Sequence, residues 1–191
     1  MILCIILVDI EEKGVKNMKE REIKMDKKKD MQISAITIAR YIVAFCAGQV
    51  VPVALTNIKL QKLLYLVFGE YYLDHGKPLF RETFEAWQYG PVVASVYDEF
   101  CAFAGSYILL SESDLGLPDN VKLDIDPIIK TNMKRDVFDL VDETHQPGSA
   151  WAKAVARNNG TIKDHPEILI EDIIEEFRKR RGKCGEDSTG R

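Results

Sequence analysis

Apolar residues recur at helical spacing over most of the chain after its first thirty or so positions. Ser34 can cap a first helical turn, and the apolar side chains beyond it repeat three or four positions apart, as at Ile38 and Ile42. A longer apolar stripe follows Thr56 and stops at Gly76, a residue type common just past helix ends. The pattern predicts a helix of about three turns and then a long, buried helix at the centre of the core.

The segment 84–93, FEAWQYGPVV, alternates between two mixed faces and predicts a short strand over 83–89. Gly90 allows a sharp backbone turn, and Pro91 suits the first position of a helix. We therefore expect an abrupt change from strand to helix at this pair, with the helix ending at Gly105.

Two further segments have the composition of strands, 107–113 (YILLSES) and 121–125 (VKLDI). A small antiparallel sheet is therefore expected beside the helices, and its pairing stays open. Three more helices are expected, the first opened by an Asp-Pro pair and the second capped by a serine, at 127–145, 150–159 and 166–181.

These elements predict a mainly α (α+β) fold, a single compact helical domain with a small antiparallel β element. We expect this domain to span residues 33–178. Residues 1–32 are expected to be a disordered N-terminal extension or a misassigned start, and residues 179–191 a mobile C-terminal tail. The apolar run at 1–8 is too short to span a bilayer, and a weak amphipathic anchor or a strand is the alternative interpretation for it.

The charge balance argues against a polyanionic partner. The 191 residues carry a formal net charge of -4, which gives no global field that attracts nucleic acid. Basic clusters at 27–29 and 178–181 are interpreted as solubilising segments, with phosphate contacts as the alternative. The four cysteines are far apart and contain no C-x-x-C pair, which suits a reducing compartment. We expect a cytoplasmic protein that does not contact membranes and for which nucleic acid is not the primary partner.

The sequence lacks the familiar signatures of catalysis. It contains no G-x-S-x-G, P-loop or G-x-G-x-x-G motif, and its three histidines stand at the ends of predicted helices. Cys101 is expected to be buried on a helix and therefore inert, although with Glu143 and His145 it forms the one constellation that an enzyme could use. We expect no catalytic activity, no metal and no cofactor.

Two strings near the middle of the chain resemble the signature of a known family. LTNIKLQKLLYLVFGEYYLDHGKPLF and FEAWQYGPVVASVYDEF are similar to the Panacea domain, the SocA-like antitoxin family, which also occurs in phage and mobile-element proteins. The family pairs L-T-x-x-K-L-Q-K-L-L-Y with E-A-W-x-x-G-P-V and a later tyrosine, which correspond to 55–65, 85–92 and Tyr97. Downstream, THQPGSAWAKA resembles the family's Thr-His and Trp-centred helix, with Ala150 before Trp151 where the family has proline.

The resemblance covers about 33–177 and implies a compact, mainly helical domain without catalysis. It implies an antitoxin that neutralises a cognate protein toxin, encoded by the adjacent gene, through direct protein contact. The resemblance also implies a second mode of action, in which the protein is an adaptor that delivers the toxin to a protease. The alternatives are a DNA-binding autoregulator and another phage or mobile-element interaction protein without catalysis.

The candidate residues lie in the motifs that carry the resemblance. Trp87 has two interpretations, as a side chain presented to a partner or as a plug between the sheet and the 57–75 helix. Lys59, Gln61 and Lys62 are expected either to contact the partner or to brace the turn at the Gly-Pro pair. The full set of expected partner-binding or motif residues is Lys59, Gln61, Lys62, Tyr65, Glu85, Trp87, Tyr89, Gly90, Pro91, Tyr97, His145 and Trp151.

Overall fold

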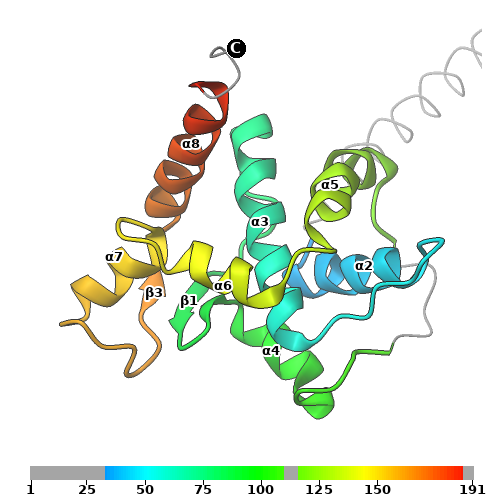
Figure 1. The fold of residues 1–191 in the computed structure, drawn as a ribbon, viewed down its shortest axis with the longest axis horizontal. Coiled ribbons are helices and arrows are strands. Elements are labelled where there is room, and N and C mark those ends of the chain that lie inside the picture. Colours follow the sequence, from blue (N-terminus) through cyan, green and yellow to red (C-terminus); the bar gives the residue numbers. More distant parts are fainter. Residues whose placement is uncertain (1–32, 110–115, 187–191) are drawn as a thin grey trace, which may run out of the picture. The chain divides into compact units, whose positions relative to one another are not determined.

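A long buried helix, α3 (Asn57–His75), lies at the centre of the computed structural model, which describes residues 33–109 and 116–186 (Figure 1). The expected extension at 1–32 lies outside the described residues, as do 110–115 and 187–191. The described residues confirm the predicted fold class, because they form a mainly helical domain with a small three-stranded antiparallel sheet. The other elements are α2 (Ala35–Ala47), β1 (Phe84–Trp87), β2 (Gly90–Val92), α4 (Ala94–Phe100), the 3-10 helix η1 (Cys101–Phe103), α5 (Asp119–Asn132), α6 (Val137–Thr144), α7 (Ala150–Arg157), β3 (Glu167–Ile168) and α8 (Ile170–Glu186).

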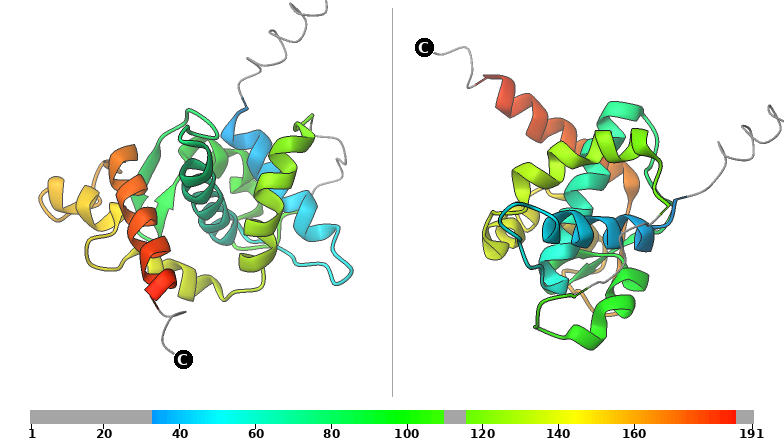
Figure 2. Two further views of the ribbon diagram at one scale, coloured as in Figure 1. Left: turned by 90° about the horizontal axis from the view of Figure 1, so that it is seen from above. Right: turned by 90° about the vertical axis from the view of Figure 1, so that its right-hand side faces the viewer.

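Helix α3 begins and ends where the sequence predicted. The hydroxyl of Thr56 accepts from the amide of Lys59, and Gly76 adopts the left-handed conformation with φ 67° while its amide donates to Tyr72. Helices α2, α4, α5, α6 and α8 all contact α3, and Figure 2 shows it between α8 on one side and α2 and α5 on the other. This central position explains why apolar side chains cover most of its circumference.

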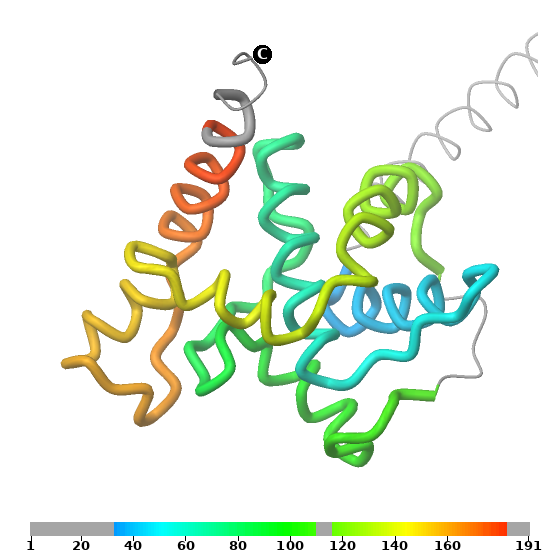
Figure 3. The backbone as a smooth tube through the Cα atoms, viewed as in Figure 1, coloured from blue at the N-terminus to red at the C-terminus, as the bar shows by residue number. Residues whose placement is uncertain are grey.

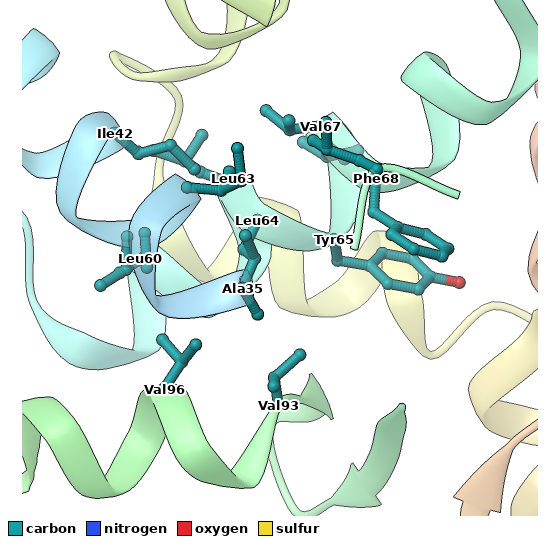
Figure 4. Close-up of a cluster of buried hydrophobic side chains, with 14 of the residues drawn as sticks. Ala35, Ile42, Leu60, Leu63, Leu64, Tyr65, Val67, Phe68, Val93 and Val96 are labelled. Carbon is teal, nitrogen blue, oxygen red and sulfur yellow. The ribbon is translucent and has the colours of Figure 1, made fainter. Parts of the chain in front are cut away.

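The main core joins α3 to α2 and to the start of α4. Leu60 and Leu64 of α3 and Ile42 of α2 have no exposed surface, and Val93 and Val96 complete the cluster from the α4 side (Figure 4). Serine 34 caps α2 through a hydrogen bond from the Thr37 amide, as its position predicted. Close packing of this cluster fixes the direction in which α4 leaves the sheet.

The Gly90-Pro91 pair does not begin a helix, and this prediction was wrong. Both residues lie in β2, which pairs antiparallel with β1 in the register Glu85↔Val92, Ala86↔Pro91 and Trp87↔Gly90. Because β2 is an edge strand in the order β2-β1-β3, the missing amide of Pro91 is tolerated. The strand therefore turns back as a hairpin, and α4 starts only at Ala94.

The remaining strand predictions were also wrong. Residues 121–125 are helical in α5, because Val121, Ile125 and Ile129 repeat every four positions and become buried. Residues 107–109 form no strand, and the rest of that segment lies outside the described residues. The third strand is β3, whose Ile168 pairs with Phe84.

Several helix limits differ from the predicted ones. Helix α5 carries Pro127 in its interior, and the expected helix at 127–145 is divided by a break before α6, where Asp136 accepts from the Phe138 amide. Helix α8 starts at Ile170 after β3 and continues to Glu186, past residue 178, where the domain was expected to end. Helix α4 ends at Phe100, well before Gly105, and η1 follows it.

The path of the chain in Figure 3 runs from α5 through α6 to α7, and α6 contacts β2. This path brings α6 to the hairpin. None of the helices in the described ranges combines the length and the apolar character needed to cross a membrane.

Candidate functional site

Two polar side chains of α3 hold the hairpin in place. The side-chain oxygen Oε1 of Gln61 accepts from the amide of Val93 at 3.0 Å, and Nζ of Lys62 donates to the carbonyl of Pro91 at 2.8 Å. Each of the two side chains is only 1% exposed. Of the two roles expected for them, the geometry supports bracing of the turn, because both side chains are bonded to the backbone of the hairpin or of the residue after it.

Burial destabilises the charged form of the Lys62 side chain. Burial lowers its pKa to about 7, and among the described residues no carboxylate pairs with it. A neutral amine can still donate a hydrogen bond to the Pro91 carbonyl. The hydrogen bond from Lys62 to the Pro91 carbonyl therefore forms both above and below neutral pH. The protonated lysine, however, is destabilised by the loss of its hydration.

Gly90 is required at the corner for two reasons. Its φ of 97° lies in a region that favours glycine, and a Cβ built there would lie 2.4 Å from Oγ1 of Thr144 and 2.7 Å from Nζ of Lys62. The hairpin thus packs closely against both α3 and the end of α6. Thr144, which sequence analysis did not select, is part of the corner.

Two rings, one at the end of α6 and one in α7, also hold the hairpin turn. Nε2 of His145 lies 3.2 Å from the carbonyl oxygen of Gln88, and Nε1 of Trp151 donates to the carbonyl of Trp87 at 2.8 Å. The two rings also contact each other, with centroids 4.0 Å apart. His145 and Trp151 therefore both lie at the hairpin and contact its backbone.

Trp87 is packed at the edge of the hairpin. Its indole nitrogen donates to Oε2 of Glu85 at 2.8 Å, and its ring stacks on His165 with centroids 4.2 Å apart. The ring of Tyr97 in α4 also contacts Trp87, with ring centroids 4.8 Å apart. The side chain is half-buried, and it links the sheet to α4 while part of its surface remains open.

A second polar cluster joins α8 to α3 and to the start of α7. The hydroxyl of Tyr65 donates to Oε2 of Glu176 at 2.9 Å, and the amide of Ala150 donates to the same oxygen at 2.6 Å. Arg180 pairs with Glu176 and with Glu143. Burial and the Glu176 carboxylate raise the pKa of Tyr65 well above its usual value. Sequence reasoning missed Glu176, although its position in the apolar stripe of α8 was an available signal.

The other expected residues differ in their exposure. Lys59 is half-buried in the first turn of α3, where its amide donates to the Thr56 cap. Tyr89 in the hairpin turn is 45% exposed and Tyr97 is 37% exposed, so these two aromatic side chains are the most accessible of the set. A cleft of about 550 Å³ opens beside them, between the hairpin, α4 and the first turns of α3.

The three residues considered for an enzyme differ in their exposure and in their contacts. Cys101 is exposed on η1, so its predicted burial was wrong, because α4 stops one residue earlier and the chain turns outward. Both ring nitrogens of His145 face backbone carbonyls, Nδ1 that of Val141 at 2.7 Å and Nε2 that of Gln88. Glu143 pairs with Arg135 and Arg180. In the part of the chain that the structure describes, no three metal-ligating side chains gather at one place.

These features define a helical domain whose sequence motifs meet around one hairpin, and the comparisons with known proteins agree with the family resemblance. Residues 60–152, which run from α3 to the start of α7, match the family model described as "Antitoxin SocA-like, Panacea domain". The chain is 28% identical over 141 residues to Antitoxin SocA of Caulobacter vibrioides (strain NA1000 / CB15N), over 68% of this chain and 73% of that protein. No solved structure matches the chain. The resemblance is confirmed, since the chain is similar to the SocA-like antitoxin family with a Panacea domain.

Proposed function

We propose that the protein is an antitoxin that neutralises a cognate toxin by direct binding in the cytoplasm, without catalysis. The observation that supports the proposal most directly is the hairpin, whose backbone is held by side chains from α3, the end of α6 and α7. It presents Tyr89 and the neighbouring Tyr97 from a fixed backbone. A surface ordered before binding loses less conformational entropy when a partner docks, and tyrosine is enriched at binding hot spots.

The toxin is proposed to be the product of the adjacent gene, and occlusion of the toxin is the proposed mode of action. Delivery to a protease is the second mode. The two modes differ in the fate of the toxin, because occlusion leaves its amount unchanged and delivery lowers it.

The C-terminal basic cluster favours the protein partner over DNA. Lys179 pairs with Glu175 at 2.5 Å, Arg181 pairs with Asp74 at 2.7 Å, and Arg180 pairs with two carboxylates. Side chains that are paired with carboxylates are poorly placed to release counterions from phosphates. This arrangement supports the interpretation of the cluster as part of the fold of α8.

Co-expression tests the proposal. The adjacent gene is induced alone and together with this chain, and growth and toxin abundance are measured. We expect growth arrest by the neighbour alone, recovery with this chain, and a stable complex after purification. A neighbour that is harmless alone, or that stays toxic beside this chain, contradicts the proposal. Recovery with a falling amount of toxin supports the protease mode.

A further inference from the structure

The cleft beside the hairpin has a volume of about 550 Å³, which is enough for a few residues of a peptide. Its walls come from the first turns of α3, the β1–β2 hairpin, the end of α4 with the turn that follows it, and residues 162 and 165. Aromatic rings form much of the lining, namely Trp87, Tyr89, Tyr97 and His165. This composition suits a segment of protein better than a small charged ligand.

Asn57 contributes a free acceptor to the cleft. Its Nδ2 donates to the carbonyl of Tyr97 at 3.1 Å, and its Oδ1 is buried without a hydrogen-bond partner. Because a carbonyl only accepts, Nδ2 has to face Tyr97 and the amide cannot be turned around. The side chain is 3% exposed, the residue lines the cleft, and Oδ1 itself is a buried acceptor.

Gln61 contributes the complementary donor. Its Oε1 accepts from the amide of Val93, which fixes its orientation in the same way, and its Nε2 is buried without a partner. The residue is 1% exposed and also lines the cleft. Asn57 and Gln61 are four positions apart in α3, so they lie on one face of the helix, one turn from each other.

A buried donor and a buried acceptor without partners both destabilise a fold, and a ligand that satisfies them gains affinity. A peptide chain offers both a carbonyl acceptor and an amide donor. The charge of the ligand follows from the lining, because none of the described residues in it is a carboxylate and Lys62 is bonded to the Pro91 carbonyl. An uncharged segment therefore fits best.

We propose that this cleft receives an uncharged, extended segment of the toxin. A backbone carbonyl of that segment accepts from Nε2 of Gln61, a backbone amide donates to Oδ1 of Asn57, and an apolar side chain packs against Trp87 and Tyr97. The inference rests on the proposed function and adds to it the surface and the chemistry of the partner.

Binding of a minimal peptide group tests the cleft without the toxin. The probe is N-acetyl-L-leucine N-methylamide, titrated to millimolar concentration into the full ¹⁵N-labelled chain. We expect saturable shifts of the side-chain amide signals of Asn57 and Gln61 and of the Trp87 indole signal. The Ile58→Arg variant, which places a charge in the cleft wall, is expected to lose them, whereas Leu123→Arg on α5 retains them. Absence of these shifts in the unmodified chain means that water alone satisfies the two free atoms, which overturns the inference.

The co-expression assay separates this inference from the proposed function. Circular dichroism first checks that both variants are folded. The inference is supported if the unmodified chain and Leu123→Arg restore growth, whereas Ile58→Arg lowers the colony count at least tenfold. If Ile58→Arg restores growth as well as the unmodified chain does, the inference is wrong and the antitoxin proposal stands. If the unmodified chain fails to restore growth, the antitoxin proposal and the toxin as occupant both fail, and the probe titration decides whether the cleft binds peptide groups at all.

Discussion

Nζ of Lys62 lies 2.8 Å from the carbonyl oxygen of Pro91, so a buried lysine of the central helix holds the edge strand of the hairpin. The same nitrogen would lie 2.7 Å from a Cβ at Gly90, which places both residues of the Gly-Pro pair against one side chain. Lys62, Gly90 and Pro91 are therefore packed against one another. This contact also makes the stability of the hairpin sensitive to pH.

Replacement of Lys62 by methionine is expected to change how stability depends on pH. In the unfolded chain a lysine keeps its proton up to a pH near 10.5, whereas burial lowers the pKa of Lys62 to about 7 in the fold. Between these values the unfolded state binds more protons, so the free energy of unfolding of the unmodified protein rises with pH. From pH 7 to 9.5 this contribution amounts to about 3 kcal/mol.

Urea unfolding of both proteins at several pH values measures this difference, and groups common to both cancel. The methionine variant is expected to lack the rise. Parallel curves for the two proteins would show that the lysine is not desolvated in the fold.

The Gly90→Ala variant is expected to be strongly destabilised, by about 3 kcal/mol or more, because strain at positive φ adds to a clash with Oγ1 of Thr144. Gly76→Ala is a matched control, since Gly76 also has positive φ but a Cβ there meets nothing within 4 Å. It is expected to cost about 1 kcal/mol. Thermal unfolding compares the two variants, and equal losses would mean that the clash is relieved without cost.

Glu176→Gln is expected to lower stability by about 2 kcal/mol, because Glu176 is buried and bonded to Tyr65, Ala150 and Arg180, and the amide leaves the arginine poorly paired. Glu175→Gln on the same helix serves as the control, since that side chain is half exposed and is expected to change stability little. Denaturant unfolding at pH 7 measures both. A loss in the control as large as that in Glu176→Gln would show that any charge change on α8 has this effect.

Tyr89→Ala is expected to weaken neutralisation of the toxin by at least tenfold without changing stability, because its side chain is exposed in the hairpin turn. Phe138→Ala is the control, since Phe138 is an exposed aromatic residue of α6, with 61% of its surface accessible. The measurements are the affinity for the purified toxin and the melting temperature. Unchanged affinity in Tyr89→Ala, or an equal loss in the control, would remove the hairpin turn from the proposed interface.

Sequence predictions succeeded where a feature depends on neighbouring residues and failed where it depends on contacts between distant segments. The limits of α2 and α3 were predictable because their caps, Ser34, Thr56 and Gly76, act on neighbouring backbone groups. The Gly-Pro pair was misread because its local preferences suit a helix start, whereas pairing of β2 with β1 decides the actual conformation. The candidate residues were found through their motifs, but the motifs did not reveal which of them are buried.

The sequence by itself determined the helical periodicity, the helix caps, the resemblance to a known family and the set of motif residues, because each of these depends on residue type and on spacing along the chain. Only the tertiary structure decided that Gln61 and Lys62 are buried braces, that Glu176 joins α8 to α3 and α7, and that Asn57 and Gln61 leave a free acceptor and a free donor in one cleft. These features depend on contacts between segments far apart in the chain. Their physical cause is the burial of polar groups in a packed core, which assigns each group a partner or leaves it without one.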